Sequence, residues 1–354
     1  MQTHKKFLFY ISQNYSFAVL RPIQKQILAR GDECIWFVEG NKVDHQFFSA
    51  TERVVKNVTE VIHYRPDAVF VPGNIVPSFI PGLKIQVWHG LPSSKAKKNG
   101  QLYHYIIRGM FDLYCTQGPD STNKFKELQA QYKTFQVIET GWSKLDPLFQ
   151  ETNFQGTQQK ESSTKKSIFF ASTFSPRFSK AQMLYPHIIK MINEYDFNWY
   201  ITLHPKMNQE TVNLYRNLES HKVTFVEPTE LAQYFKKADM MLCDTSSIIY
   251  EFLTLLKPVV TFKTEKVEDC LINVEKIEEL EKTILEILGD PEINQENIRD
   301  RVSQFHPYSD GQSSQRILQA VDQMLAGHFG QLKKKPYNFL RNLKLRKILN
   351  YWKW

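Results

Sequence analysis

The sequence predicts an α/β protein with two doubly wound domains that face a cleft, followed by a basic, aromatic tail. Its 354 residues are enough for two domains of about 150 residues each. Strand-like and helix-like stretches alternate in two halves, as is typical of doubly wound domains. A polar stretch without periodicity, residues 152–166, separates the halves. We therefore expect an N-terminal domain over residues 1–155, a second domain over 156–326 and the tail over 327–354.

Short apolar runs predict the strands, and stretches with helical periodicity predict the helices. In the first half the expected strands are 7–11, 34–38, 68–71, 85–87, 113–116 and 137–138, and the expected helices are 18–30 and a stretch around 100–110. In the second half the expected strands are 167–171, 199–203, 223–226, 240–243 and 259–262, and the expected helices are 181–194, one that begins at 248, and 313–326. Ligands in such sheets bind beyond the carboxyl ends of the strands, so residues directly after strands are the candidates for function.

Composition excludes several classes of protein. Apolar residues make up 42% of the chain and charged residues 23%, which is ordinary for a soluble globular protein. The four cysteines are scattered without a CxxC pair, which indicates reduced thiols and a cytoplasmic setting rather than a disulfide or zinc framework. The first apolar stretch spans only about five residues, too few for a signal peptide or a membrane span.

The positive charge of the chain is concentrated in its tail. Residues 331–354 contain eight Lys and Arg and no acid, which leaves 37 basic and 37 acidic residues in the body. A neutral body argues against a nucleic-acid-binding protein. Basic residues mixed with aromatic ones suit an anionic membrane surface, although the apolar positions do not collect on one face of an ideal helix. A solvated tail, or one with a protein or nucleic-acid partner, is the alternative. The residues expected at the membrane are Lys333, Lys334, Lys335, Arg341, Lys344, Arg346, Lys347, Trp352 and Trp354.

A polar turn from Asp244 to Ser247 connects an apolar strand to a helix. Ser and Thr at such a turn cap free backbone N–H groups, and a helix N-terminus attracts an anion. Ordinary capping uses one or two such residues, so four in a row favour a phosphate site. Glu251, one helical turn further on, could reach a ribose hydroxyl or could simply be a solvated helix residue.

Polar groups follow four other expected strands. His89-Gly90 comes after the strand at 85–87, and a histidine there could exchange a proton near neutral pH or could merely cap a turn. His204 and Lys206 follow the strand at 199–203. Gln117 and the segment 141–146 follow the other two strands. The sequence contains no GxxxxGK[ST], GxGxxG, HExxH or GxSxG pattern, so we expect helix N-termini, hydroxyls, His and Lys to neutralise the anion, without a metal ion.

The order of these motifs resembles the CDP-glycerol glycerophosphotransferase family, the teichoic-acid primases and polymerases. The resemblance covers residues 80–325 and rests on the stretches "VWHGLPSSK", "GWSKLDPLF", "FFASTFSP", "ITLHPKM", "ADMMLCDTSSIIYEFLTLLKPVVTF" and "DGQSSQRI". It implies a GT-B fold of two Rossmann-like domains, with the acceptor on the N-terminal domain and the nucleotide donor on the second. It also implies a peripheral location on the cytoplasmic face of the membrane, and a role in cell-wall or capsule biosynthesis.

The resemblance also implies a reaction and a set of residues. A hydroxyl of a lipid-linked or glycan acceptor would attack the β-phosphorus of CDP-glycerol and release CMP, with no cofactor besides this donor. His89 would be the base and His204 would stabilise developing charge, although the two could exchange roles. The expected donor-binding residues are Gly90, Lys206, Asp244, Thr245, Ser246, Ser247, Glu251, Ser313, Ser314 and Arg316. Those expected near the acceptor are Ser93, Ser94, Lys95, Lys144 and Asp146.

Departures from the family pattern leave alternatives open. Residues 91–95 read Leu-Pro-Ser-Ser-Lys where the family usually has Thr-Pro-Leu-Lys, Thr245 replaces a common tyrosine, and Lys144 replaces a common arginine. A CDP-ribitol donor or another glycan acceptor is therefore compatible with the sequence. A nucleotide-sugar glycosyltransferase would share the fold, and so would an enzyme resembling UDP-N-acetylglucosamine 2-epimerases, although those sites are rich in acids. A non-catalytic membrane scaffold is the remaining alternative.

Overall fold

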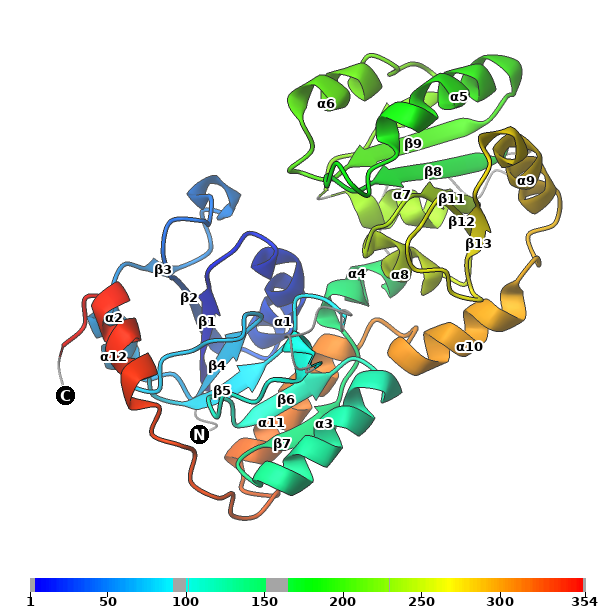
Figure 1. The fold of residues 1–354 in the computed structure, drawn as a ribbon. Coiled ribbons are helices and arrows are strands. Elements are labelled where there is room, and N and C mark those ends of the chain that lie inside the picture. Colours follow the sequence, from blue (N-terminus) through cyan, green and yellow to red (C-terminus); the bar gives the residue numbers. More distant parts are fainter. Residues whose placement is uncertain (1–3, 92–99, 101, 151–164, 229, 353–354) are drawn as a thin grey trace. The chain divides into compact units, whose positions relative to one another are not determined.

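The chain folds into two compact units, each built on a parallel sheet (Figure 1). The computed structural model describes residues 4–91, 100, 102–150, 165–228 and 230–352. Unit 1 consists of Met1–Gln150 and Phe305–Trp354, and unit 2 consists of Glu151–Gln304. This confirms the predicted α/β fold with two Rossmann-like domains.

Unit 1 contains a seven-stranded parallel sheet in the order β3-β2-β1-β4-β5-β6-β7. Its strands are β1 (Lys6–Ile11), β2 (Glu33–Val38), β3 (Val54–Val55), β4 (Ala68–Val71), β5 (Leu83–Gln86), β6 (Leu113–Thr116) and β7 (Gln136–Glu139). The chain first adds strands on one side of β1 and then continues from β4 on the other side. The carboxyl ends of β1 and β4 therefore form the switch point at which such sheets bind ligands.

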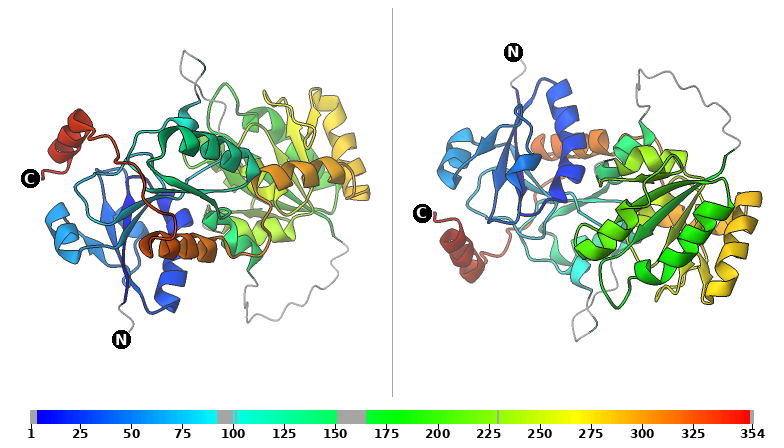
Figure 2. Two further views of the ribbon diagram at one scale, coloured as in Figure 1. Left: turned by 90° about the horizontal axis from the view of Figure 1, so that it is seen from below. Right: turned by 90° about the horizontal axis from the view of Figure 1, so that it is seen from above.

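Helices cover both faces of this sheet (Figure 2). Apolar residues of α1 (Ser16–Ala29) and α11 (Ser313–Leu325) share one core with the sheet, and those of α2 (Val58–Tyr64), α3 (Pro119–Tyr132) and α12 (Phe339–Ile348) share the other. The remaining helical pieces are η1 (His45–Phe47), η2 (Tyr103–Tyr105), η3 (Ser143–Leu145) and α4 (Asp146–Phe149).

Unit 2 repeats the plan with six parallel strands in the order β10-β9-β8-β11-β12-β13. The strands are β8 (Ser167–Ser172), β9 (Asn198–Leu203), β10 (Val223–Phe225), β11 (Met240–Cys243), β12 (Val259–Phe262) and β13 (Ile272–Val274). The helices are α5 (Ala181–Glu194), α6 (Gln209–Arg216), α7 (Leu231–Lys237), α8 (Ile248–Leu253), α9 (Ile277–Gly289) and α10 (Gln295–Phe305). Its switch point lies between β8 and β11.

Two expectations about organisation are wrong. The second domain was expected to extend to residue 326, but α11 buries Ile317, Leu318 and Val321 in the same core as α1, which makes it part of unit 1. The stretch around 100–110 forms only the short η2 among its described residues. The expected linker at 152–166 lies mostly outside the described residues.

The state of the cysteines and the length of the helices can be read from the structure directly. All four thiols are unpaired, and three of them are buried; burial raises the pKa of Cys270 to about 11. Among the helices of the described residues, none is long and apolar enough to cross a bilayer.

Candidate functional site

His89 lies just beyond β5 in unit 1, with one ring nitrogen engaged. Its Nδ1 is 2.8 Å from the carbonyl oxygen of Pro72. A carbonyl oxygen can only accept, so Nδ1 must carry the hydrogen. In the neutral ring Nε2 is then unprotonated and holds a lone pair, and the imidazole is exposed. This is the tautomer that a general base requires.

The backbone on both sides of His89 is fixed by other strand ends. Trp88 has a φ of 32°, an unfavourable left-handed conformation for a bulky residue. Its carbonyl accepts the Trp142 indole N–H at 3.0 Å, and the Gly90 carbonyl accepts the Gln117 side-chain amide at 2.9 Å. Trp142 follows β7 and Gln117 follows β6, so residues far apart in sequence hold the His89 turn.

A half-buried histidine, His104, packs against the same turn. His104 stacks on the Trp88 indole with ring centroids 4.0 Å apart. Burial, with a smaller contribution from His89, lowers the pKa of His104 to about 3. The ring is therefore neutral at physiological pH and packs as an aromatic group against Trp88.

His204 follows β9 in unit 2 and has the opposite tautomer. Its Nδ1 accepts the backbone N–H of Lys206 at 3.0 Å, so the hydrogen of the neutral ring is on Nε2. Burial, and to a smaller extent the Lys206 ammonium, lower the pKa of His204, which favours this neutral form. Phe174 contacts the imidazole with centroids 4.4 Å apart. The Nε2 atom of neutral His204 is thus a hydrogen-bond donor, whereas the Nε2 atom of neutral His89 is an acceptor.

Asp244 joins the two strands at the switch point of unit 2. The carboxylate is fully buried; Oδ1 accepts the N–H groups of Thr173 at 3.0 Å and Thr245 at 2.6 Å. Oδ2 accepts the Lys180 N–H at 3.0 Å and the Ser172 hydroxyl. Burial raises the pKa of Asp244, and these hydrogen bonds oppose the rise. Asp244 therefore holds the loop after β8 against the turn after β11, and its expected contact with the donor stays a prediction.

The hydroxyls after Asp244 differ in how exposed they are. Thr245 Oγ1 is 3.2 Å from Thr264 Oγ1 and is half-buried. Ser247 is exposed, and its side chain makes no capping hydrogen bond to the six-residue α8. Ser246 is half-buried like Thr245, with Oγ 3.5 Å from the Ile248 backbone nitrogen. Glu251 is buried rather than solvated, at 8% exposure.

The start of α11 already holds an anion from its own unit. The N–H groups of Ser313 and Ser314 donate to Asp146 Oδ1 and Oδ2 at 2.9 and 2.8 Å, and all three residues are buried. Burial raises the pKa of Asp146, and the hydrogen bonds from these serines oppose the rise. The carboxylate is the anion that a helix N-terminus attracts. Ser313, Ser314 and Asp146 are thus engaged with one another, and their expected contacts with donor and acceptor stay predictions.

Arg316 is also part of the scaffold of unit 1. Its guanidinium forms a two-pronged ion pair with Asp310 at 2.7 and 3.0 Å, and Nε donates to the Thr140 carbonyl at 2.9 Å. These bonds engage the guanidinium within unit 1, and its expected donor contact stays a prediction. Lys144 is half-buried beside the Trp142 ring, 5.2 Å from its centroid. Ser93, Ser94 and Lys95 lie outside the described residues.

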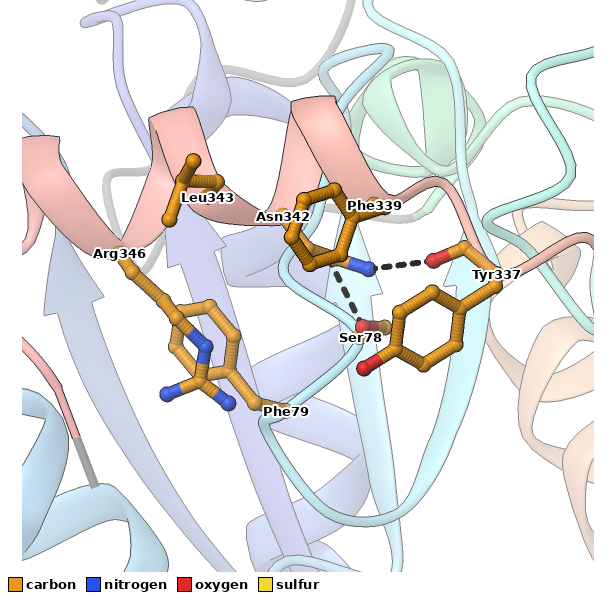
Figure 3. A pocket seen from close by; sticks show the side chains of 7 residues that line it. All are labelled: Ser78, Phe79, Tyr337, Phe339, Asn342, Leu343 and Arg346. Atoms are coloured by element: carbon orange, nitrogen blue, oxygen red, sulfur yellow. Dashed lines mark hydrogen bonds between the residues drawn. The ribbon is translucent and has the colours of Figure 1, made fainter. Parts of the chain in front are cut away.

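The tail folds back on unit 1 and buries part of its charge (Figure 3). Arg346 lies 4.5 Å from the centroid of Phe79, is only 8% exposed, and lines a cavity of about 180 Å³. Lys335 pairs with Asp112 at 2.7 Å, and Arg341 donates to the Arg108 carbonyl at 3.3 Å. These contacts tie the three basic residues to unit 1, although Lys335 and Arg341 are only half-buried, and their role at a membrane stays a prediction. Lys333, Lys334, Lys344, Lys347 and Trp352 are exposed, and Trp354 lies outside the described residues.

Residues 40–322 match a family model for UDP-N-acetylglucosamine 2-epimerase. The chain belongs to the UDP-N-acetylglucosamine 2-epimerase family. A comparison with curated proteins found no match. The resemblance to the CDP-glycerol glycerophosphotransferase family remains a prediction, because the family model that matches is that of the 2-epimerases.

Solved structures of this epimerase family and of a teichoic-acid enzyme share the fold. The wall teichoic acid polymerase TagF superposes with a TM-score of 0.64 at 16% identity, covering 92% of this chain and 90% of that chain. S. aureus MnaA, in a structure with UDP, gives 0.61 at 17% identity, with coverages of 91% and 97%. A UDP-N-acetylglucosamine 2-epimerase gives 0.56 at 16% identity, with coverages of 95% and 99%. At these identities the likeness establishes the GT-B-like fold.

Two residues at the His89 turn were missed by sequence reasoning. Tyr15 stacks on the imidazole, and the Pro72 carbonyl accepts its hydrogen. Both follow strands, β1 and β4, so inspection of every strand end could have found them. Among the described residues, no three His, Cys, Asp or Glu side chains gather as a metal site.

Proposed function

We propose that this chain transfers a polyol phosphate from a CDP-polyol, CDP-glycerol in the first instance, to an acceptor hydroxyl on a glycan or lipid-linked carrier. The single observation that carries the proposal is the unprotonated Nε2 that the Pro72 hydrogen bond leaves on the exposed His89 ring of unit 1. His89 presents an unprotonated Nε2, and His204 presents an Nε2–H group. Phosphoryl transfer to an alcohol needs both an acceptor for the alcohol proton and a donor for charge on the phosphoryl or leaving oxygen.

The proposed reaction is a displacement at the β-phosphorus of the donor. The acceptor hydroxyl gives its proton to His89 Nε2 as its oxygen forms a bond to the β-phosphorus. The bond between that phosphorus and the oxygen bridging to the α-phosphorus breaks, and CMP leaves with the electron pair. For unit 2, considered by itself, the proposal gives His204, Ser246, Ser247 and Lys206 the phosphates of the donor as ligands, with the His204 N–H as a hydrogen-bond donor. General base catalysis contributes about 10²–10⁴-fold.

A 2-epimerase is the second candidate, favoured by the family match. Epimerisation at a carbon beside the nucleotide-bearing position needs groups that remove and return a proton there, and acids commonly serve. Asp244 and Asp146, two carboxylates that follow strands in this chain, are buried and hydrogen-bonded within the scaffold. His, Ser and Lys occupy the more exposed positions, a set better suited to phosphate chemistry.

We further propose that the tail contacts an anionic membrane surface through the outer face of α12. The inner face of this helix contributes Leu345 to the core of unit 1, and beside it Asn342 bonds to Ser78 and Arg346 packs on Phe79. The outer face carries Leu340, Lys344, Lys347 and Ile348, and Leu340 is 79% exposed. An outer face that exposes leucine, isoleucine and lysine matches a surface that is both apolar and anionic. A cytoplasmic, peripheral location follows from this proposal.

The test is a calorimetric titration of the purified chain with CDP-glycerol, CDP-ribitol, UDP-N-acetylglucosamine and GDP-mannose. We expect binding of a CDP-polyol, and release of CMP when an acceptor is added. His89→Asn should abolish CMP release while leaving donor Kd within about two-fold, because the base does not hold the ground-state donor. Preference for UDP-N-acetylglucosamine, with formation of its 2-epimer, would overturn the phosphotransfer proposal.

A further inference from the structure

Two loops that flank the switch point of unit 1 hold the ring of His89. Tyr15 follows β1 and packs flat on the imidazole, with centroids 4.3 Å apart and planes 22° apart. Pro72 follows β4 and accepts the Nδ1 hydrogen at 2.8 Å. Because β1 and β4 are neighbours in the sheet, both loops reach the same side chain.

The two contacts restrict different motions of the ring. The hydrogen bond to Pro72 anchors one nitrogen but lets the imidazole swing about the Nδ1···O axis. The Tyr15 ring covers one face and opposes that swing, since parallel aromatic packing is lost as the planes separate. With both contacts in place, Nε2 points in a single direction.

We propose that Tyr15 is the positioning residue of His89, which keeps the unprotonated Nε2 aimed at the acceptor hydroxyl. The inference rests on the proposed function for the role of His89, and it adds a residue in a part of the chain where no functional role had been expected. Supporting groups of this kind matter because a misplacement of about 1 Å at a reacting atom can cost about 100-fold in rate.

Tyr15 can be altered without disturbing the fold. Its side chain is 40% exposed, and its backbone is held by the start of α1, where the Ser16 and Phe17 N–H groups bond to the Gln13 and Asn14 carbonyls at 3.2 Å. The backbone around His89 is fixed separately by Trp142 and Gln117. Loss of the Tyr15 ring should therefore free the imidazole and leave the turn in place.

The decisive experiment measures how firmly the His89 ring is held, by ¹³C relaxation of the labelled histidine rings at pH 8, with His89→Asn to assign the signals. We expect an ordered ring in wild type and Tyr15→Phe and a mobile ring in Tyr15→Leu, with the Nδ1–H form kept in all three because the bond to Pro72 remains. Tyr132→Leu is the matched control, because Tyr132 is 41% exposed on the same unit. An equally ordered ring in Tyr15→Leu would overturn the proposal.

Kinetics give the second readout. Tyr15→Leu should lower kcat for CMP release by about 10-fold with KM for CDP-glycerol unchanged within about two-fold, and Tyr15→Phe should restore kcat. Equal losses in Tyr15→Phe and Tyr15→Leu would assign the effect to the hydroxyl and overturn the positioning role of the ring. If wild type released no CMP, the proposed function would fail, while the NMR spectra would still decide whether Tyr15 holds His89.

Discussion

Acidification should destabilise unit 1 through a histidine that the folded chain keeps neutral. His306 is 2% exposed, and its Nε2 accepts the backbone N–H of Trp142 at 3.1 Å. Burial, with a smaller contribution from the Arg316 guanidinium, lowers the pKa of His306 to about 4. Protonation of Nε2 would break the bond to Trp142 and leave a charge in an apolar site.

The direction of this change in stability follows from which state of the chain, folded or unfolded, binds the proton. The unfolded chain has a histidine pKa of about 6.5, so between that value and about 4 it binds a proton that folded unit 1 does not. Stability is therefore fully present above about pH 6.5 and declines as the pH falls towards 4. At pH 5 the calculated loss from this one group is about 2 kcal/mol.

The assay is urea unfolding at pH 7.5 and pH 5.0, monitored by tryptophan fluorescence. This signal reports mainly on unit 1, because Trp199 is the one tryptophan of unit 2. His306→Gln removes the titrating group. We expect wild type to lose about 2 kcal/mol more than this variant between the two pH values. An equal loss in both proteins would refute the account.

Three further predictions concern the scaffold, the donor turn and the tail. Asp146→Asn should lower the free energy of unfolding of unit 1 by about 2 kcal/mol in urea, because an N–H group at the start of α11 loses its acceptor. The Kd for the donor should not change. A weaker donor affinity at unchanged stability would contradict the scaffold role of Asp146. Ser247→Ala should weaken CDP-glycerol binding by about 5-fold in calorimetry at an unchanged Tm, since its hydroxyl caps nothing in α8. Unchanged affinity would remove Ser247 from the donor site. Leu340→Glu with Ile348→Glu should abolish sedimentation with phosphatidylglycerol vesicles, whereas Leu325→Glu, at a 37% exposed position of α11, should not. Equal loss in both variants, or none in either, would contradict a membrane contact through the outer face of α12.

Much of the fold could be predicted because apolar runs and helical periodicity are local signals. The strands at Ala68–Val71, Leu113–Thr116 and Met240–Cys243 and the helix at Ala181–Glu194 were predicted to the residue. The helix at Pro119–Tyr132 was missed, because its sequence is polar and only its first turn carries a start signal.

The sequence by itself determined that His89, His204 and the hydroxyls after Asp244 follow strands, since that depends only on the order of local elements. Only the tertiary structure decided which polar groups were already occupied. Asp146 meets Ser313 and Ser314 across 167 and 168 residues, and Asp244 meets Thr173 across 71. The same holds for Tyr15 on His89, which depends on β1 lying beside β4, and for the packing of α12 on unit 1. Such partners are set by strand order and packing, and hydrogen-bond partners so far apart leave no periodicity in the sequence.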